Sequence, residues 1–126
     1  MFEERSISIL SYNLETVLGE KMETILSRAD ANTRMRDYYD IYVLLNEKRD
    51  TIRSEILRAA FEATCRKRNT LKLTAQVSGI LNAVKDSEVL KRQWENYRKS
   101  SYYVGQLEWK EVFAGTEELA KMLQMI

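Results

Sequence analysis

The sequence predicts a mainly α-helical protein, a bundle of about six helices that begins with one short strand. Three observations support this class. The chain contains no proline and 4 glycines among 126 residues, so few positions interrupt a helix. Apolar residues recur at helical spacing along most of the chain, and alternation of period two is confined to residues 6–10. A chain of this length buries a core of its own as one domain, residues 1–126.

The first segments are predicted from periodicity and capping residues. Residues 6–10 alternate polar and apolar side chains, which favours a short strand. Asn13 can cap a first helix that runs to about Arg28. Residues 29–33 form a loop, and Asn32 or Thr33 can cap the second helix. The expected inward residues of these two helices are Leu14, Leu18, Met22 and Ile25, then Met35, Tyr38, Tyr42 and Leu45.

Four more helices follow, with one or two helical turns before the last of them. Asp50 or Thr51 can cap a third helix with Ile52, Ile56, Ala59, Ala60 and Ala63 facing inward. Residues 69–74 suit either a loop or a short strand. A fourth helix carries Val77, Ile80, Leu81 and Val84, and Asp86 or Ser87 opens a fifth with Leu90, Trp94 and Tyr97. Residues 108–114 are expected to form one or two helical turns. Gly115-Thr116 is expected to end them and cap the last helix, with Leu119, Met122, Leu123 and Ile126.

Composition excludes several chemistries. The chain has no histidine and one cysteine, so it has no histidine-based acid–base or metal site, no paired-cysteine zinc site and no internal disulfide. Cys65 lies in a helical pattern and is expected to be a buried small hydrophobe. No signal-like or membrane-spanning segment is visible, which predicts a cytoplasmic protein with no membrane partner.

Charge is uneven although the net charge is +1. Residues 46–72 carry 8 basic and 4 acidic groups and include the run Arg66-Lys67-Arg68. This run suits a helix C-terminus, where cations complement the helix dipole, and a phosphate-contacting patch is the alternative. Five aromatic residues of the last third are expected to be core, with a base-stacking platform as the alternative. They are Trp94, Tyr97, Tyr102, Tyr103 and Trp109.

One charged constellation departs from ordinary patterning. Lys21 and Arg28 continue the apolar stripe of the first helix, because residues seven apart lie two turns apart on one face. Asp37 and Asp40 share a face of the second helix. We expect the two helices to pack antiparallel, with both cations near both carboxylates. Arg36 is expected to point away from Asp40. An ion-pair network that locks the helices is one interpretation, and a site for phosphate chemistry is the other.

The same residues carry a resemblance. Residues 14–21 with Lys21, then Arg28, then residues 32–42 with Arg36, Asp37 and Asp40 resemble the AbiEii/AbiGii toxin family, over residues 12–45 most clearly. Members are bacterial nucleotidyltransferases of toxin–antitoxin and phage abortive-infection systems. The resemblance implies that Lys21, Asp40 and Asp37 are catalytic and that Lys21, Arg28 and Arg36 contact the nucleotide. It also implies Mg²⁺ and a nucleoside triphosphate for the complete enzyme, with no metal site in this chain.

The resemblance further implies that this chain is the C-terminal helical part of such an enzyme. Family members carry an N-terminal half with a Gly-Ser or Gly-Gly-Thr turn and a paired-aspartate strand, and nothing before residue 12 matches that half. We therefore expect the isolated chain to be inactive and its partners to be the missing half, a cognate antitoxin and tRNA. Two alternatives stay open. One is a non-catalytic helical module that binds an antitoxin, a partner protein or RNA. The other is an ion-paired motif retained without function.

Overall fold

The computed structural model describes the backbone of residues 4–126 and the side chains of residues 13–126. Six α-helices and no strand occur in the described backbone, which confirms the mainly α class. They are α1 (Glu4–Arg28), α2 (Met35–Lys48), α3 (Ser54–Lys67), α4 (Val77–Asp86), α5 (Glu88–Ser100) and α6 (Trp109–Met122). Short 3₁₀ turns join them at Ala29–Ala31, Arg49–Thr51, Leu71–Ala75 and Tyr102–Val104. None of the described helices is long and apolar enough to cross a membrane.

Both candidate strands are helical. Residues 6–10 lie inside α1, so the predicted leading strand is wrong. Residues 69–74 contribute to the Leu71–Ala75 turn, which matches the loop alternative. A strand needs a neighbouring strand for its backbone hydrogen bonds, and the described chain offers none, whereas a helix satisfies those groups within one segment.

The kink at Asn13 divides α1 into two parts. The backbone there is non-helical (φ −163°, ψ 83°), and its Oδ1 accepts a hydrogen bond from the Thr16 N–H at 3.2 Å. This confirms Asn13 as a cap for the part of α1 that follows. Leu14, Leu18, Met22 and Ile25 are all buried there, as their spacing predicts.

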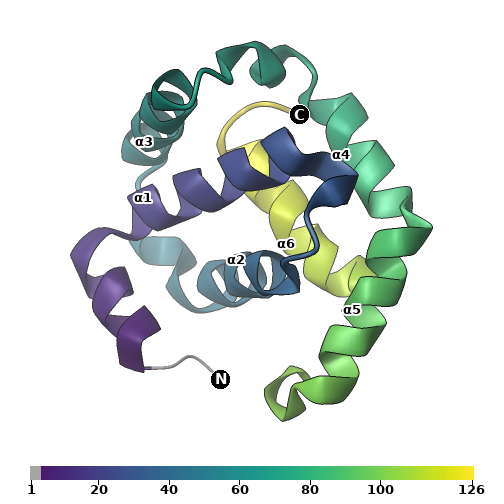
Figure 1. Cartoon of the computed structure of the whole chain (residues 1–126). Helices are drawn as coiled ribbons and strands as arrows, with labels where there is room; N and C mark the ends of the chain where they lie inside the picture. Colours follow the sequence, from purple (N-terminus) through teal and green to yellow (C-terminus); the bar gives the residue numbers. More distant parts are fainter. Residues whose placement is uncertain (1–3) are drawn as a thin grey trace.

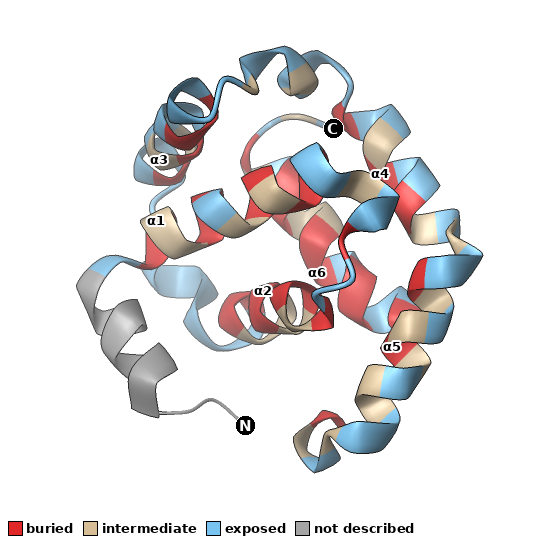
Figure 2. Cartoon of the chain, viewed as in Figure 1, coloured by how far each residue is buried: buried red, intermediate tan, exposed pale blue. Residues whose placement is uncertain are grey.

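The helices enclose one core. α1 packs mainly on α3 and α2 mainly on α6. In Figure 1, α2 runs opposite to α1, and α4 and α5 follow one another along one edge. Figure 2 shows the buried faces turned toward the middle of this arrangement. The largest fully buried side chains are Trp94, Tyr38 and Phe113. Trp94 and Trp109 are therefore core residues as predicted, while Tyr102 is 87% exposed.

The buried face of α3 differs from the predicted one. Leu57, Phe61, Thr64 and Cys65 are buried, whereas Ile56, Ala59 and Ala63 are exposed. The two faces are one residue out of register, and the observed one buries Leu57 and Phe61, which have far more apolar surface than alanines. The buried state of Cys65 was predicted correctly.

Two glycines, Gly19 and Gly115, allow neighbouring helices to approach closely. Gly115 lies inside the continuous helix α6, so the predicted break at Gly115-Thr116 is wrong. A Cβ atom at Gly115 would lie 2.8 Å from the Tyr42 Cα of α2. A Cβ atom at Gly19 would lie 3.1 Å from the Phe61 backbone nitrogen of α3. The missing side chain at Gly115 therefore sets the distance between two packed helices rather than ending one.

We predict that Gly115→Ala lowers the free energy of unfolding by about 1–3 kcal/mol, because the new methyl group forces α2 and α6 apart. Gly79→Ala is the matched control, since no atom lies within 4 Å of a Cβ there. That substitution should raise stability by about 0.5–1 kcal/mol through helix propensity alone. Urea denaturation of both variants measures the difference, and equal effects would contradict the role given to Gly115.

Candidate functional site

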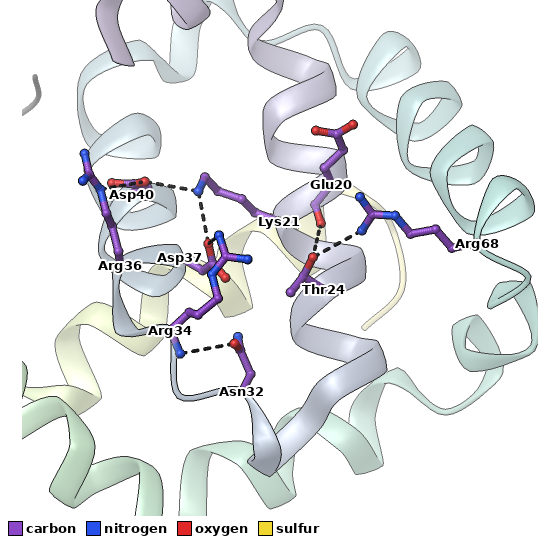
Figure 3. Close-up of polar contacts among 9 residues, drawn as sticks. All are labelled: Glu20, Lys21, Thr24, Asn32, Arg34, Arg36, Asp37, Asp40 and Arg68. Carbon is purple, nitrogen blue, oxygen red and sulfur yellow. Dashed lines mark hydrogen bonds and ion pairs between the residues drawn. The ribbon is translucent and has the colours of Figure 1, made fainter. Parts of the chain in front are cut away.

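Lys21 lies between two carboxylates of the neighbouring helix. It follows Leu18 by one turn and precedes Ile25 by another, and both of those side chains are fully buried. Its Nζ is 3.2 Å from Asp37 Oδ1 and 3.1 Å from Asp40 Oδ2 (Figure 3). The Lys21 side chain is 20% exposed, against 3% for Asp37 and 10% for Asp40. The predicted approach of Lys21 to both carboxylates is therefore confirmed, as is the partly buried character of the cluster.

The two arginines of the constellation behave differently from the prediction. Arg36 Nε lies 3.6 Å from Asp40 Oδ2, so the expectation that it points away is wrong. The two residues are four apart in α2 and so share a face. Arg28 is exposed and forms no ion pair with Asp37, Asp40 or any other described residue. It lies two turns beyond Lys21, about 10 Å along the helix axis, which removes it from the cluster.

Arg34 and Asn32 were not predicted as site residues, although Asn32 was a candidate cap for the second helix. Arg34 Nη2 approaches Asp37 Oδ1 at 3.7 Å, which gives that carboxylate a second cation. Asn32 is fully buried and its Oδ1 accepts a hydrogen bond from the Arg34 N–H at 3.3 Å. Asn32 thus holds the turn before α2. The N-cap residue of α2 is Arg34 and it makes no side-chain cap hydrogen bond, so the predicted cap at Asn32 or Thr33 is wrong. The available signal was the Asn-x-Arg order, since asparagine commonly accepts a bond from the N–H two residues on.

Burial decides the protonation behaviour of Asp40. Desolvation raises the pKa of its carboxyl above the ordinary value of 3.8, although Lys21 and Arg36 act to lower it and Asp37 adds to the rise. A buried carboxyl with a raised pKa and a cation on each side is typical of catalytic positions, although structural ion pairs show the same shifts.

A tyrosine cluster adjoins the Asp40 end of the site. The hydroxyls of Tyr97 and Tyr103 are 2.7 Å apart, and the Tyr39 hydroxyl donates to the Tyr103 carbonyl at 3.4 Å. Burial and the Tyr103 hydrogen bond raise the pKa of Tyr97, and the charges that act on it include Arg36 and Asp40. The sequence grouped Tyr97 and Tyr103 with the core aromatics, because nothing local places the end of α5 next to α2.

The residues present do not form a magnesium site by themselves. No group of three or more metal-ligating side chains gathers in the part of the chain that the structure describes. The oxygens Asp37 Oδ1 and Asp40 Oδ2 both face the Lys21 ammonium, which repels a divalent cation. What the cluster can supply is a held ammonium group and a carboxylate of raised pKa about one helical turn from a second carboxylate.

We predict strong coupling between Lys21 and Asp37. A double-mutant cycle with Lys21→Met and Asp37→Asn should give an interaction free energy of about 1–3 kcal/mol, because either single change leaves a buried charge without its partner. Arg49 and Glu118 form the control pair, with Nη1 2.9 Å from Oε2 and both side chains well exposed. Their cycle, with Arg49→Met and Glu118→Gln, should give about 0.2–1 kcal/mol. Chemical denaturation at low salt measures both, and equal values would refute the difference.

We also predict that Asp40 makes the protein less stable as it ionises. Asp40 holds its proton to a higher pH in the folded protein than in the unfolded chain. The free energy of unfolding of the wild type therefore decreases as the pH rises from near 3.8 through the pKa of folded Asp40. Asp40→Asn cannot ionise, so its stability relative to wild type should increase over that window and be greatest at neutral pH. Thermal unfolding across the pH range measures this, with the exposed Asp50→Asn as control. A stability of Asp40→Asn that decreases relative to wild type toward neutral pH would contradict the prediction.

A known protein family matches the part of the chain that contains this site. The family model described as nucleotidyl transferase AbiEii toxin, Type IV TA system, matches residues 1–115 and thus includes Lys21, Asp37 and Asp40. No curated protein and no solved structure matches the chain. The match extends from the predicted motif through α5 and into α6, well past the segment on which the resemblance was first based. The chain therefore belongs to the AbiEii family of toxin–antitoxin nucleotidyl transferases.

Proposed function

We propose that this chain is the C-terminal helical part of a nucleotidyltransferase toxin, in which Lys21 contacts the nucleotide and Asp40 acts in catalysis. The observation that carries the proposal is the placement of one lysine between two carboxylates on a mostly buried face, inside a chain of this family. We further propose a bacterial, cytoplasmic setting in phage defence, with a cognate antitoxin as partner.

Lys21 is suited to hold a phosphate group. An ammonium group has three donors, and two of them face Asp37 and Asp40. The third is left for a ligand, and the side chain is 20% exposed, so solvent reaches it. Held between carboxylates, the lysine presents its positive charge from a fixed point, which is what stabilisation of a transferring phosphoryl group requires.

Asp40 is suited to accept a proton. In nucleotidyl transfer an acceptor hydroxyl attacks the α-phosphorus, a new P–O bond forms, and the bond to the bridging oxygen breaks to release pyrophosphate. The hydroxyl proton passes to the Asp40 carboxylate, whose raised pKa brings it closer to the range of an effective base. Arg36 beside Asp40 and Asp37 on the other side of Lys21 would keep both groups in place.

The remaining assignments depend on groups outside this site. Mg²⁺, which neutralises the triphosphate in such reactions, would be held by an N-terminal half rather than by Asp37 and Asp40. That half would complete the site from the open side of Lys21. We propose Arg28 and Arg36 as further nucleotide contacts and tRNA as an acceptor.

The test uses the complete open reading frame that encodes this chain. Each α-³²P-labelled nucleoside triphosphate is incubated with the protein and with total RNA, and transfer of label is measured. Asp40→Asn should reduce the transfer roughly 100-fold or more, and Lys21→Gln should do the same, because one removes the base and the other a transition-state cation. Asp50→Asn and Lys110→Gln are matched exposed controls and should retain activity.

The outcomes separate the interpretations. Full transfer by both Asp40→Asn and Lys21→Gln, with folding intact by circular dichroism, would show that the cluster is structural. Absence of transfer by the wild-type protein with every nucleotide would favour the non-catalytic module that binds an antitoxin, partner protein or RNA.

A further inference from the structure

A second charged feature lies at the C-terminal end of α1. A hollow of about 390 Å³ opens where the end of α1, the start of α2 and the turn after α3 meet. It is lined by Glu23, Thr24, Ser27, Arg28, Arg34, Arg68 and Thr70. We call it the arginine groove. Figure 3 shows Arg34 and Arg68 flanking Thr24 of α1.

The groove has excess positive charge on its walls. Glu23 is the one acidic residue of the lining, and it is buried and already paired. Its carboxylate receives Arg68 Nη1 at 2.5 Å and the Thr70 hydroxyl at 3.0 Å. Arg28 forms no ion pair with a described residue, and the Arg34 side chain is 62% exposed. Among the described residues, Arg28 therefore has no carboxylate near it, and Arg34 approaches Asp37 Oδ1 at 3.7 Å, an oxygen that Lys21 already contacts at 3.2 Å.

The hydroxyl groups of the lining already donate hydrogen bonds within the protein, so their hydrogens are not available to a ligand. Thr24 donates to the Glu20 carbonyl, Ser27 to the Thr24 carbonyl, and Thr70 to Glu23. The remaining donors are the N–H groups of Arg28 and those N–H groups of Arg34 that do not face Asp37. The guanidinium fork matches the oxygens of a phosphate. The lining contains no apolar residue, which disfavours an acidic peptide because its other side chains would find no contact.

We infer that the arginine groove binds a phosphate group through Arg28 and Arg34, with Arg68 adding charge from the wall. Arg34 also contacts Asp37, so a ligand in the groove lies beside the Lys21 cluster, which consists of Lys21, Asp37 and Asp40. Two sources offer this chemistry, the polyphosphate of a nucleotide and the phosphodiester backbone of an RNA strand. The inference depends on the proposed function only for that choice of sources.

The test is direct binding to the chain, with no activity required. Tripolyphosphate is titrated calorimetrically, and a fluorescein-labelled oligouridylate is followed by anisotropy at several salt concentrations. The groove variant combines Arg28→Gln with Arg34→Gln and leaves Arg68 to neutralise Glu23. The control variant combines Arg92→Gln with Lys110→Gln, which removes the same charge from exposed positions on α5 and α6. Lys21→Gln reports on the neighbouring cluster.

We expect at least tenfold weaker binding of one probe by the groove variant and near-wild-type binding by the control. Loss of the two contacts should also reduce the salt slope for RNA by about 1.4, at about 0.7 per phosphate. Loss with tripolyphosphate identifies a nucleotide polyphosphate, and loss with RNA alone identifies a strand. Equal binding by groove and control variants, or no binding of either probe by wild type, overturns the inference. Loss confined to Lys21→Gln overturns it too, while the proposed function stands.

Discussion

Three charged side chains in the part of α1 whose side chains the structure describes, residues 13–28, are buried or largely buried, and each contacts a different segment of the chain. Glu15 accepts the Arg53 N–H at 3.0 Å at the start of α3, Lys21 bridges the two aspartates of α2, and Glu23 pairs with Arg68 after α3. A buried charge without a partner is strongly unfavourable, so each contact restricts where its segment can lie. α1 thus orients α2 and both ends of α3, and the apolar stripe between these charges supplies the attraction that packs them.

The two carboxylates of the Lys21 cluster, Asp37 and Asp40, lie in different environments. Asp37 is almost wholly buried and has both Lys21 and Arg34 nearby, whereas Asp40 is slightly more open and its pKa is raised despite two neighbouring cations. An interaction selected for stability alone would favour ionised Asp40. A carboxylate whose ionisation opposes folding occurs at functional sites, which commonly reduce stability, and buried structural ion pairs show the same shift.

The arginine groove and the Lys21 cluster meet at Arg34. Arg34 Nη2 lies 3.7 Å from Asp37 Oδ1, and Arg34 also lines the groove with Arg28 and Arg68. The basic run at the end of α3 has two roles in this arrangement. Arg66 and Lys67 lie in the last turn of the helix, as predicted from its dipole, whereas Arg68 turns back toward α1 and compensates buried Glu23.

The sequence by itself determined the helical class, the cap at Asn13 and the pairing of Lys21 with Asp37 and Asp40. Helical periodicity and i, i+3 spacing are local, so they show in the residues alone. Only the tertiary structure decided that residues 6–10 are helical, that α3 buries Leu57 and Phe61, that Arg28 leaves the cluster, and that Gly115 lies in contact with Tyr42. Each of these depends on which distant segment packs alongside. A local pattern specifies the face of a helix, but not the neighbour that covers it.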